Sequence, residues 1–448
     1  MVLFMHKFFS LLVSAILSLV LVACGGKGES APPPTNFTAT AGDGQVTLTW
    51  VDTPGVEYWV FYAPGTLAAG QDILQATGHK SVSKVTSPLI LVLPNATAYS
   101  FTIDGRTGGG PGGAKASFQN ATPRAAGNTW STATLNTATS NTFRALTFGQ
   151  DASGVFDFLA VGDMRTLYYK ASTAADADNW IQISSATSIG STANLTAATY
   201  SSGRFLVGDS SGNIFYSSDL STWTATAAHP ASINAMASNG TSSVAVGSGG
   251  SIWYAADGIT WTPINAVPGG GPTLRGVSYL SSGVWMAVGD NGVVWTSSDA
   301  QTWSAPSGYT PVSEALYSVA YRPALTVDPL TGATVSYANQ YILVGASGRV
   351  VTSPDLTTWA SSAINGAGNL TSVTATPSQF LAVDDAGKAF ALVNGVSWSG
   401  STSTQAGNLT AVINTMNLGN SINANTLITG VTARYVAVGA NGQITYSR

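Results

Sequence analysis

The fold is indicated most clearly by the segment Met286-Ala-Val-Gly-Asp-Asn-Gly-Val-Val-Trp-Thr-Ser-Ser-Asp-Ala-Gln-Thr-Trp303. Two apolar runs flank a turn that contains Gly289 and Gly292, and this pattern is typical of a β-hairpin. A Ser-x-Asp turn then leads to Trp303. The chain repeats this unit with small changes, and the other copies run over Leu159–Trp180, Phe205–Trp223, Val244–Trp261, Ile342–Trp359 and Leu381–Trp398.

An apolar strand precedes each copy, as in Leu195–Tyr200, Leu274–Tyr279 and Leu316–Tyr321. For the last copy we favour Leu409–Ile413 over the alternative Ile428–Thr432. Four short strands per unit, repeated about every 40 residues, predict the blades of a β-propeller. An open solenoid is the alternative architecture, but its ends would need polar caps, and the sequence shows none.

The two ends of the repeat region complement each other. The last copy, Val436–Ser447, stops without a Trp strand, whereas Asn128–Trp130 supplies a Trp strand before the first hairpin. We therefore expect residues 125–448 to form a seven-bladed β-propeller closed by its N-terminal strand, with Trp130 beside Ile444. Closure pairs sheet edges that would otherwise remain open.

The turn before each Trp gives a family resemblance. The segments Ser217–Trp223, Ser297–Trp303 and Ser353–Trp359 read Ser-x-Asp-x-x-Thr-Trp. They resemble the Asp-box repeat of bacterial neuraminidases and photosystem II assembly-factor-like propellers, although they are one residue shorter than the usual Asp-box. The resemblance implies a fold and no activity. We interpret Asp219, Asp257, Asp299 and Asp355 as turn formers that accept backbone N–H groups, and we expect each Trp to pack between blades.

The N-terminal segment reads as an export signal. Residues 1–23 combine a weakly basic start with the apolar run Phe8–Val22, which is short for a membrane span. The run ends in Leu21-Val-Ala-Cys24, which resembles the lipobox of bacterial lipoproteins. That resemblance implies cleavage before Cys24, lipidation of its thiol and a lipid anchor in the envelope membrane. Gly25 in place of Asp favours the outer membrane, and a plain secretory signal is the alternative. Residues 24–34 predict a flexible tether.

Residues 35–123 predict an immunoglobulin-like sandwich. Strand patterns cover Val46–Trp50 and Tyr58–Tyr62, and a turn at Leu93 leads into Tyr99–Ile103. Together with Pro34, this layout resembles a fibronectin type III domain. In that family the Trp fills the core between the sheets and the Tyr contacts upstream backbone. The fold class we expect is therefore all-β, with this sandwich followed by the propeller.

Composition excludes several function classes. Charged residues make up 8% of the 448, the net charge is −4, and no Lys/Arg cluster gives the basic footprint that nucleic acid requires. The single Cys and three His leave no nucleophile triad or zinc site, so we expect no catalytic residues, cofactor or metal site. A calcium site at Asp176–Asn179 stays open as an alternative.

We expect the protein to be a non-catalytic, cell-surface binding protein for a protein, peptide or glycan, or an envelope assembly factor. Long loops on a rigid scaffold are where propellers bind, and they place His229, Tyr309 and Glu314 as candidate binding residues. A structural surface protein without a ligand site is one alternative. An extracellular glycan-active hydrolase or lyase is another, because paired carboxylates could come from the acids after the Val-Gly pairs, although turn formation is the simpler interpretation. These acids are Asp163, Asp209, Asp290, Asp384 and Asp385.

Overall fold

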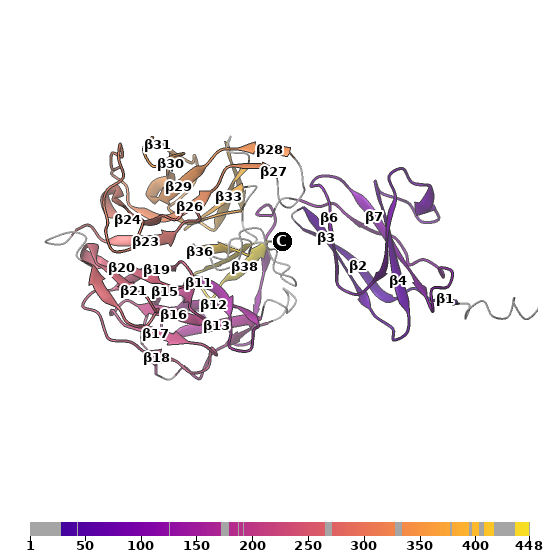
Figure 1. Ribbon diagram of the computed structural model, residues 1–448, viewed down its shortest axis with the longest axis horizontal. Coiled ribbons are helices and arrows are strands. Elements are labelled where there is room, and N and C mark those ends of the chain that lie inside the picture. Colours follow the sequence, from indigo (N-terminus) through magenta and orange to yellow (C-terminus); the bar gives the residue numbers. More distant parts are fainter. Residues whose placement is uncertain are drawn as a thin grey trace, which may run out of the picture. The chain divides into compact units, whose positions relative to one another are not determined.

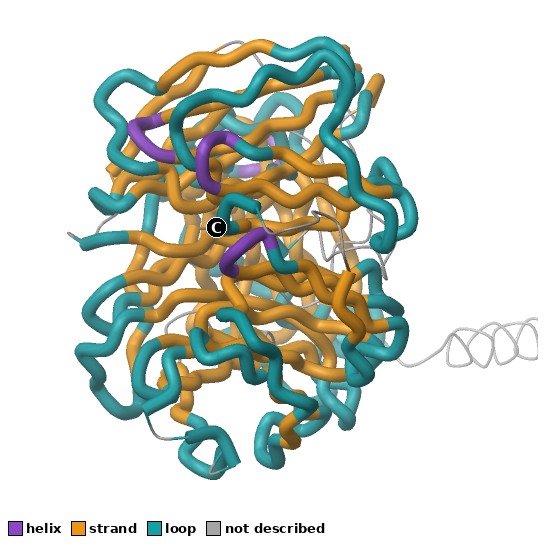
Figure 2. The backbone as a smooth tube through the Cα atoms, turned by 90° about the vertical axis from the view of Figure 1, so that its left-hand side faces the viewer, coloured by secondary structure: helices purple, strands orange, loops and turns teal. Residues whose placement is uncertain are grey.

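The computed structural model describes residues 28–447 except 43, 125, 172–178, 187, 191, 265–270, 328–333, 377–378, 394–396, 403–406 and 416–434. The described backbone is all-β, with short 3-10 turns as its helical elements (Figure 2). It divides into two compact units, Met1–Arg124 and Ala125–Arg448. Within the described ranges, no helical segment has the length and apolar character of a membrane span. Cys24, Asp176, Asp178 and Ile428 lie outside the described residues.

The smaller unit contains two sheets. One sheet has the order β1 (Ser30–Ala31), β7 (Tyr99–Arg106), β4 (Glu57–Pro64) and β5 (Lys80–Val85), with β8 (Gln119–Ala121) also paired to β7. The other has the order β2 (Thr35–Gly42), β3 (Gln45–Val51) and β6 (Leu89–Val92). A 3-10 turn, η1, covers Ile73–Gln75.

The core of this unit lies between strands of both sheets. Trp50 of β3 is 6% exposed and meets Tyr58 of β4 edge-on, with ring centroids 6.1 Å apart. The expectation for Trp50 is therefore confirmed. Tyr99 is also buried, but among the described residues its hydroxyl has no hydrogen bond, so the expected contact with upstream backbone is absent. The Tyr58 hydroxyl instead accepts a hydrogen bond from the Thr53 backbone N–H at 3.2 Å.

In the larger unit, the described strands form seven sheets and one separate hairpin. One edge strand of each sheet is called its first strand and gives the sheet its name; these strands are β11, β15, β19, β23, β26, β32 and β36. The β11 sheet contains β10 (Thr134–Leu135), β14 (Asn179–Gln182), β13 (Thr166–Ala171), β12 (Phe156–Gly162) and β11 (Phe143–Gln150). The β15 sheet contains β15 (Leu195–Ser201), β16 (Arg204–Asp209), β17 (Ile214–Ser217) and β18 (Thr224–Ala225). The β19 sheet contains β19 (Ile233–Ser238), β20 (Ser243–Gly247), β21 (Ile252–Ala255) and β22 (Thr262–Ile264). The β23 sheet contains β23 (Leu274–Tyr279), β24 (Trp285–Gly289) and β25 (Val294–Ser297).

The remaining three sheets follow the same order. The β26 sheet contains β26 (Leu316–Arg322), β29 (Gln340–Gly345), β30 (Arg349–Ser353) and β31 (Ala360–Ala363). The β32 sheet contains β32 (Leu370–Ala375), β33 (Gln379–Asp384), β34 (Lys388–Val393) and β35 (Ser397–Thr402). The β36 sheet contains β36 (Leu409–Asn414), β37 (Tyr435–Gly439), β38 (Ile444–Ser447) and β9 (Ser131–Thr132). The separate hairpin pairs β27 (Leu325–Val327) with β28 (Thr334–Tyr337).

The first strands of the sheets lie next to one another in chain order, from β11 through β15, β19, β23, β26 and β32 to β36, and β36 contacts β11 again. Figure 1 shows β36 and β38 beside β11 and β12, although almost the whole unit separates them in the sequence. The last sheet takes its fourth strand from the start of the unit. There β9 pairs with β38 at Thr132↔Thr445 and Ser131↔Tyr446, and Ala133 N–H donates to the Ile444 carbonyl at 2.9 Å.

A β-bulge near the start of each first strand explains the repeated Val-Gly pair. In all seven sheets the register with the second strand shifts after the first residue, as between Leu274 and Gly276. The bulge brings the incoming chain against the end of the second strand. A Cβ on Gly289 would lie 2.2 Å from the Thr273 carbonyl oxygen, so only glycine fits. The β15 and β32 sheets depart from this rule, because Asp209 and Asp384 stand at the equivalent position.

The Asp turns match their expected role. Asp219, Asp257, Asp299 and Asp355 each accept two backbone N–H groups of their own turn at 2.7–2.9 Å. Backbone hydrogen bonds from Thr302 and Gln301 lower the pKa of Asp299 to about 2. The following Trp is buried at Trp223 and Trp303, but Trp261 and Trp359 are only half-buried.

Two sheets do not have the expected four strands. The β23 sheet has three strands among the described residues, and an isolated bridge between Thr296 and Ser304 stands where the fourth was expected. The β11 sheet has five, because β10 adds in parallel to β14. The strand chosen for the last repeat, Leu409–Asn414, is confirmed as β36.

Candidate functional site

A central cavity runs between the first strands of all seven sheets. It has a volume of about 340 Å³ and is lined by residues of β11, β15, β19, β23, β26, β32 and β36. We call the end of this cavity where the first strands begin its mouth. The second residue of each first strand lines the mouth, and the seven residues in chain order are Arg144, Thr196, Asn234, Arg275, Tyr317, Thr371 and Thr410.

Four of these second residues join neighbouring sheets. Asn234 donates from Nδ2 to the Leu274 carbonyl at 2.8 Å, and Thr371 donates to the Leu409 carbonyl at 2.8 Å. Thr196 donates to the Ile233 carbonyl in the same way. The Thr410 hydroxyl donates to the Phe143 carbonyl at 2.6 Å, so it joins the β36 sheet to the β11 sheet. In each case the bond satisfies a carbonyl at the start of the next first strand, next to its bulge.

The other three second residues do not make this bond. Among the described residues, Arg144, Arg275 and Tyr317 donate to no group of a neighbouring sheet. Arg144 binds Asp163 of its own sheet, with Nη2 2.9 Å from Oδ2, and Arg275 binds Asp290 of its own sheet, with Nη2 3.1 Å from Oδ2. Both arginine side chains remain 44–45% exposed.

The arginines retain hydrogen-bonding capacity. A guanidinium has five N–H donors, and each aspartate occupies only two nitrogens of its partner. The hydrogen bond with Asp290 raises the pKa of Arg275, so this side chain stays charged. Its guanidinium also lies 5.9 Å from the ring centroid of Tyr317 on the next sheet. The carboxylates therefore orient the two guanidinium groups at the mouth and leave donors for a ligand.

The acids after the Val-Gly positions thus serve two different roles. Asp209 accepts the backbone N–H groups of Ser211 and Asn213, and Asp384 accepts those of Ala386 and Lys388, as turn formation predicts. Asp163 and Asp290 also begin turns through their backbone carbonyls, but their carboxylates bind Arg144 and Arg275 instead of the turn. Asp385 bonds to the backbone N–H and the side chain of Asn369.

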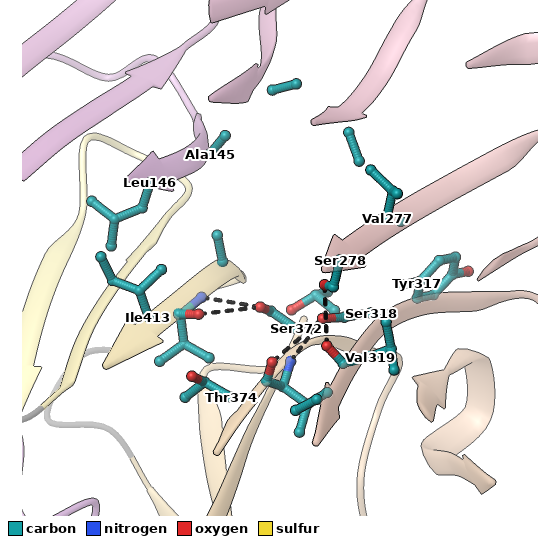
Figure 3. A pocket seen from close by; sticks show the side chains of 18 of the residues that line it. Ala145, Leu146, Val277, Ser278, Tyr317, Ser318, Val319, Ser372, Thr374 and Ile413 are labelled. Atoms are coloured by element: carbon teal, nitrogen blue, oxygen red, sulfur yellow. Dashed lines mark hydrogen bonds between the residues drawn. The ribbon is translucent and has the colours of Figure 1, made fainter. Parts of the chain in front are cut away.

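Deeper in the cavity the walls combine apolar side chains with hydroxyl groups. Figure 3 shows serine hydroxyls connecting adjacent first strands. Ser278 bonds to the Val319 carbonyl at 3.3 Å, and Ser318 and Ser372 each accept a backbone N–H of the next sheet at 3.2 Å. Because the serines are used between the sheets, the chemistry open to a ligand lies at the mouth.

The residues proposed from the sequence hold their own loops. His229 is half-buried beside Trp253, with ring centroids 5.1 Å apart, and burial lowers its pKa. Tyr309 donates its hydroxyl to the Gly292 carbonyl at 2.7 Å and packs on Trp359. Glu314, in the same loop as Tyr309, forms an ion pair with Arg349 that lowers the pKa of its carboxyl.

His229 is placed apart from the other two, beside the β19 sheet, so the structure does not assemble the three into one site. The residues that stand out at the mouth, Arg144, Arg275 and Tyr317, were not among the sequence candidates. Aligning the second residue of each first strand would have found them. Among the described residues, no group of three or more His, Cys, Asp or Glu could hold a metal ion.

The larger unit has the fold of a β-propeller, as its similarity to solved structures shows. No protein-family model matches the chain, and no curated protein matches it. A structure described as YCF48 bound to D1 peptide aligns with 71% of this chain and 94% of its own, at a TM-score of 0.52 and 15% identity. The WD40 β-propeller domain of Doa1 aligns with 72% of this chain and 97% of its own, at a TM-score of 0.50 and 8% identity. A structure of YCF48 from Cyanidioschyzon merolae aligns with 71% of this chain and 98% of its own, at a TM-score of 0.47 and 14% identity. The propeller predicted from the repeats is confirmed at the level of the fold.

Proposed function

We propose that residues 125–448 form a seven-bladed β-propeller closed by β9, and that this propeller is a non-catalytic binding module. Its ligand is a peptide or a segment of a protein, which binds at the mouth of the central cavity. The observation that carries the proposal is the division of the seven mouth residues. Four are used between sheets, whereas Arg144, Arg275 and Tyr317 present large polar or aromatic groups to the mouth.

Arginine and tyrosine suit this role. The planar guanidinium forms two parallel hydrogen bonds with a carboxylate, and both residue types are enriched where proteins bind one another. In this proposal an acidic side chain or a C-terminal carboxylate of the ligand binds the donors that Asp163 and Asp290 leave available. The D1 peptide named in the description of one YCF48 structure adds support, because a propeller of similar fold binds a peptide.

A peptide display library selected on the full chain tests the proposal. We expect peptides that contain carboxylates and that bind the double variant Arg144→Gln/Arg275→Gln at least tenfold more weakly, since a charge-assisted hydrogen bond contributes about 1.5–3 kcal/mol. The matched control is Arg204→Gln, because Arg204 lies on β16 and does not line the cavity. Peptides whose affinity is the same for the double variant and the wild type would contradict the proposed site.

For the N-terminal part we propose a lipid-anchored protein of a bacterial envelope, with a fibronectin type III-like spacer at residues 35–123. The support is the segment Leu21–Cys24 and, for the spacer, the two small sheets around Trp50. Expression of Cys24→Ser alongside the wild type tests the anchor. We expect the wild type in the membrane fraction with a mass increase from acyl chains, and the variant without either property. Membrane association of the variant equal to that of the wild type would contradict anchoring at Cys24.

A further inference from the structure

A buried arginine lies at the opposite end of the β26 sheet from the mouth. Arg322 is the last residue of β26 and is 3% exposed. Its Nε and Nη1 atoms are buried and have no hydrogen-bond partner. Its Nη2 atom makes a long contact of 3.4 Å with Gln340 Oε1. A buried guanidinium that uses so few of its donors is costly, because the group has left water without replacing those hydrogen bonds.

The surroundings do not neutralise this charge. The guanidinium lies near two aromatic rings, 4.5 Å from the centroid of Tyr337 on β28 and 5.2 Å from that of Phe380 on β33. Burial lowers the pKa of Arg322, and the one opposing influence comes from Tyr337. Among the described residues, no carboxylate forms an ion pair with it, in contrast to Arg144, Arg275 and Arg349.

A cavity adjoins this arginine. It has a volume of about 360 Å³ and is lined by Arg322, by Ser336–Gln340 and by Thr352–Pro354. The β27–β28 hairpin, which replaces the tight turn found between β15 and β16, supplies part of the wall. In the β15 sheet Ser201, which pairs with Arg204, takes the place that Arg322 has in the β26 sheet. A buried arginine at this position is therefore not part of every repeat.

We propose that this pocket binds a carboxylate, with Arg322 as the residue that recognises it. Two aromatic rings contact the guanidinium, and its Nε and Nη1 groups, which lack partners, can each donate a hydrogen bond to a carboxylate oxygen. A single positive charge matches a carboxylate, whereas a phosphate dianion would leave unbalanced negative charge in a buried place. The site is independent of the peptide site proposed at the mouth, because the two lie at opposite ends of β26.

Titration of the full chain, labelled with ¹⁵N at arginine side chains, tests this assignment. The probe is acetate, with acetamide as its neutral counterpart, and the Arg322 Nε–Hε signal is identified by its absence in Arg322→Lys. We expect acetate to shift this signal saturably, with a Kd of about 1–10 mM for so small a ligand, and acetamide to leave it in place. The control Arg204→Gln keeps the shift.

Two further arms identify the source of the carboxylate. One probe is a blocked tripeptide with an Asp side chain and an amidated C-terminus, and the other carries Asn and a free C-terminal carboxylate. Tighter binding of the first indicates a side-chain carboxylate as the ligand, and tighter binding of the second indicates a C-terminal carboxylate. An Arg322 signal that acetate leaves in place, or that acetamide shifts equally, overturns the proposal.

Discussion

Seven positions with the same place in the repeat divide into two groups in this protein. At the second residue of the first strand, Thr196, Asn234, Thr371 and Thr410 bond to the carbonyl that begins the next sheet. At the same position of other sheets, Arg144 and Arg275 bind an aspartate of their own sheet, and Tyr317 lies beside Arg275. Equivalent backbone positions therefore carry either a side chain that joins two sheets or one that does not.

The mouth therefore does not need all seven inter-sheet bonds. Each such bond contributes about 1 kcal/mol, which the packing between neighbouring sheets exceeds. Positions that do not make this bond can hold other functional groups, and in this chain they hold two guanidinium groups and a phenol. Substitutions at the two groups of positions should accordingly change different properties.

The largest effect is expected where the first and last sheets meet. Ala133→Pro removes the N–H that donates to the Ile444 carbonyl and places a proline beside the β9–β38 pair. We expect a loss of about 3 kcal/mol of unfolding free energy, measured by urea denaturation. The control Ala133→Ser keeps the N–H. Equal stability of the proline variant and this control would contradict the prediction, because the pairing of β9 with β38 would then contribute nothing to stability.

A smaller effect is expected at the mouth itself. Thr410→Val removes the hydroxyl that donates to the Phe143 carbonyl and leaves the side-chain shape nearly unchanged. We expect a loss of about 1 kcal/mol in unfolding free energy and an unchanged peptide affinity. Thr224→Val, at an exposed strand position, serves as the control. If Thr410→Val were as stable as this control, the hydrogen bond between Thr410 and Phe143 would not contribute to stability.

The smallest effect concerns the two roles of the aspartates. The pKa of Asp299 is about 2, below the value near 3.9 of an unfolded chain, because backbone N–H groups of Thr302 and Gln301 bind its carboxylate. The resulting stabilisation is present above about pH 4 and is lost as the pH falls towards 2. We expect the melting temperature of Asp299→Asn to fall less steeply over this range than that of the wild type. Parallel curves would mean that the turn does not depend on the charge.

Much of this architecture could be predicted from the sequence, because its signals are local and repeated. The glycine of the Val-Gly pair marks a close approach of backbone in most copies, as at Gly289, and the Ser-x-Asp turn marks a hairpin that binds its own N–H groups. Repetition allows weak copies to be recognised from strong ones. Asp384 in place of glycine shows how far a copy can depart and still form its sheet.

The candidate sites could not be predicted in the same way, because they depend on contacts between distant segments. Nothing near Arg144 in the sequence announces its bond to Asp163, which requires the bulge and the following hairpin. The burial of Arg322 depends on Tyr337 in an inserted hairpin and on Phe380 of the next sheet. Conversely, loop residues such as Tyr309 looked available, but the structure uses this side chain to hold its loop.

We propose that the mouth residues divide into a ligand-binding group and a structural group. The most direct measurement compares Arg144→Gln/Arg275→Gln with Thr371→Val/Thr410→Val, and determines for each the Kd of a selected carboxylate peptide and the melting temperature. We predict that the arginine pair loses at least tenfold in affinity with little change in melting, and that the threonine pair shows the reverse. Equal affinity losses in the two double variants, or full affinity in the arginine pair, would contradict the account.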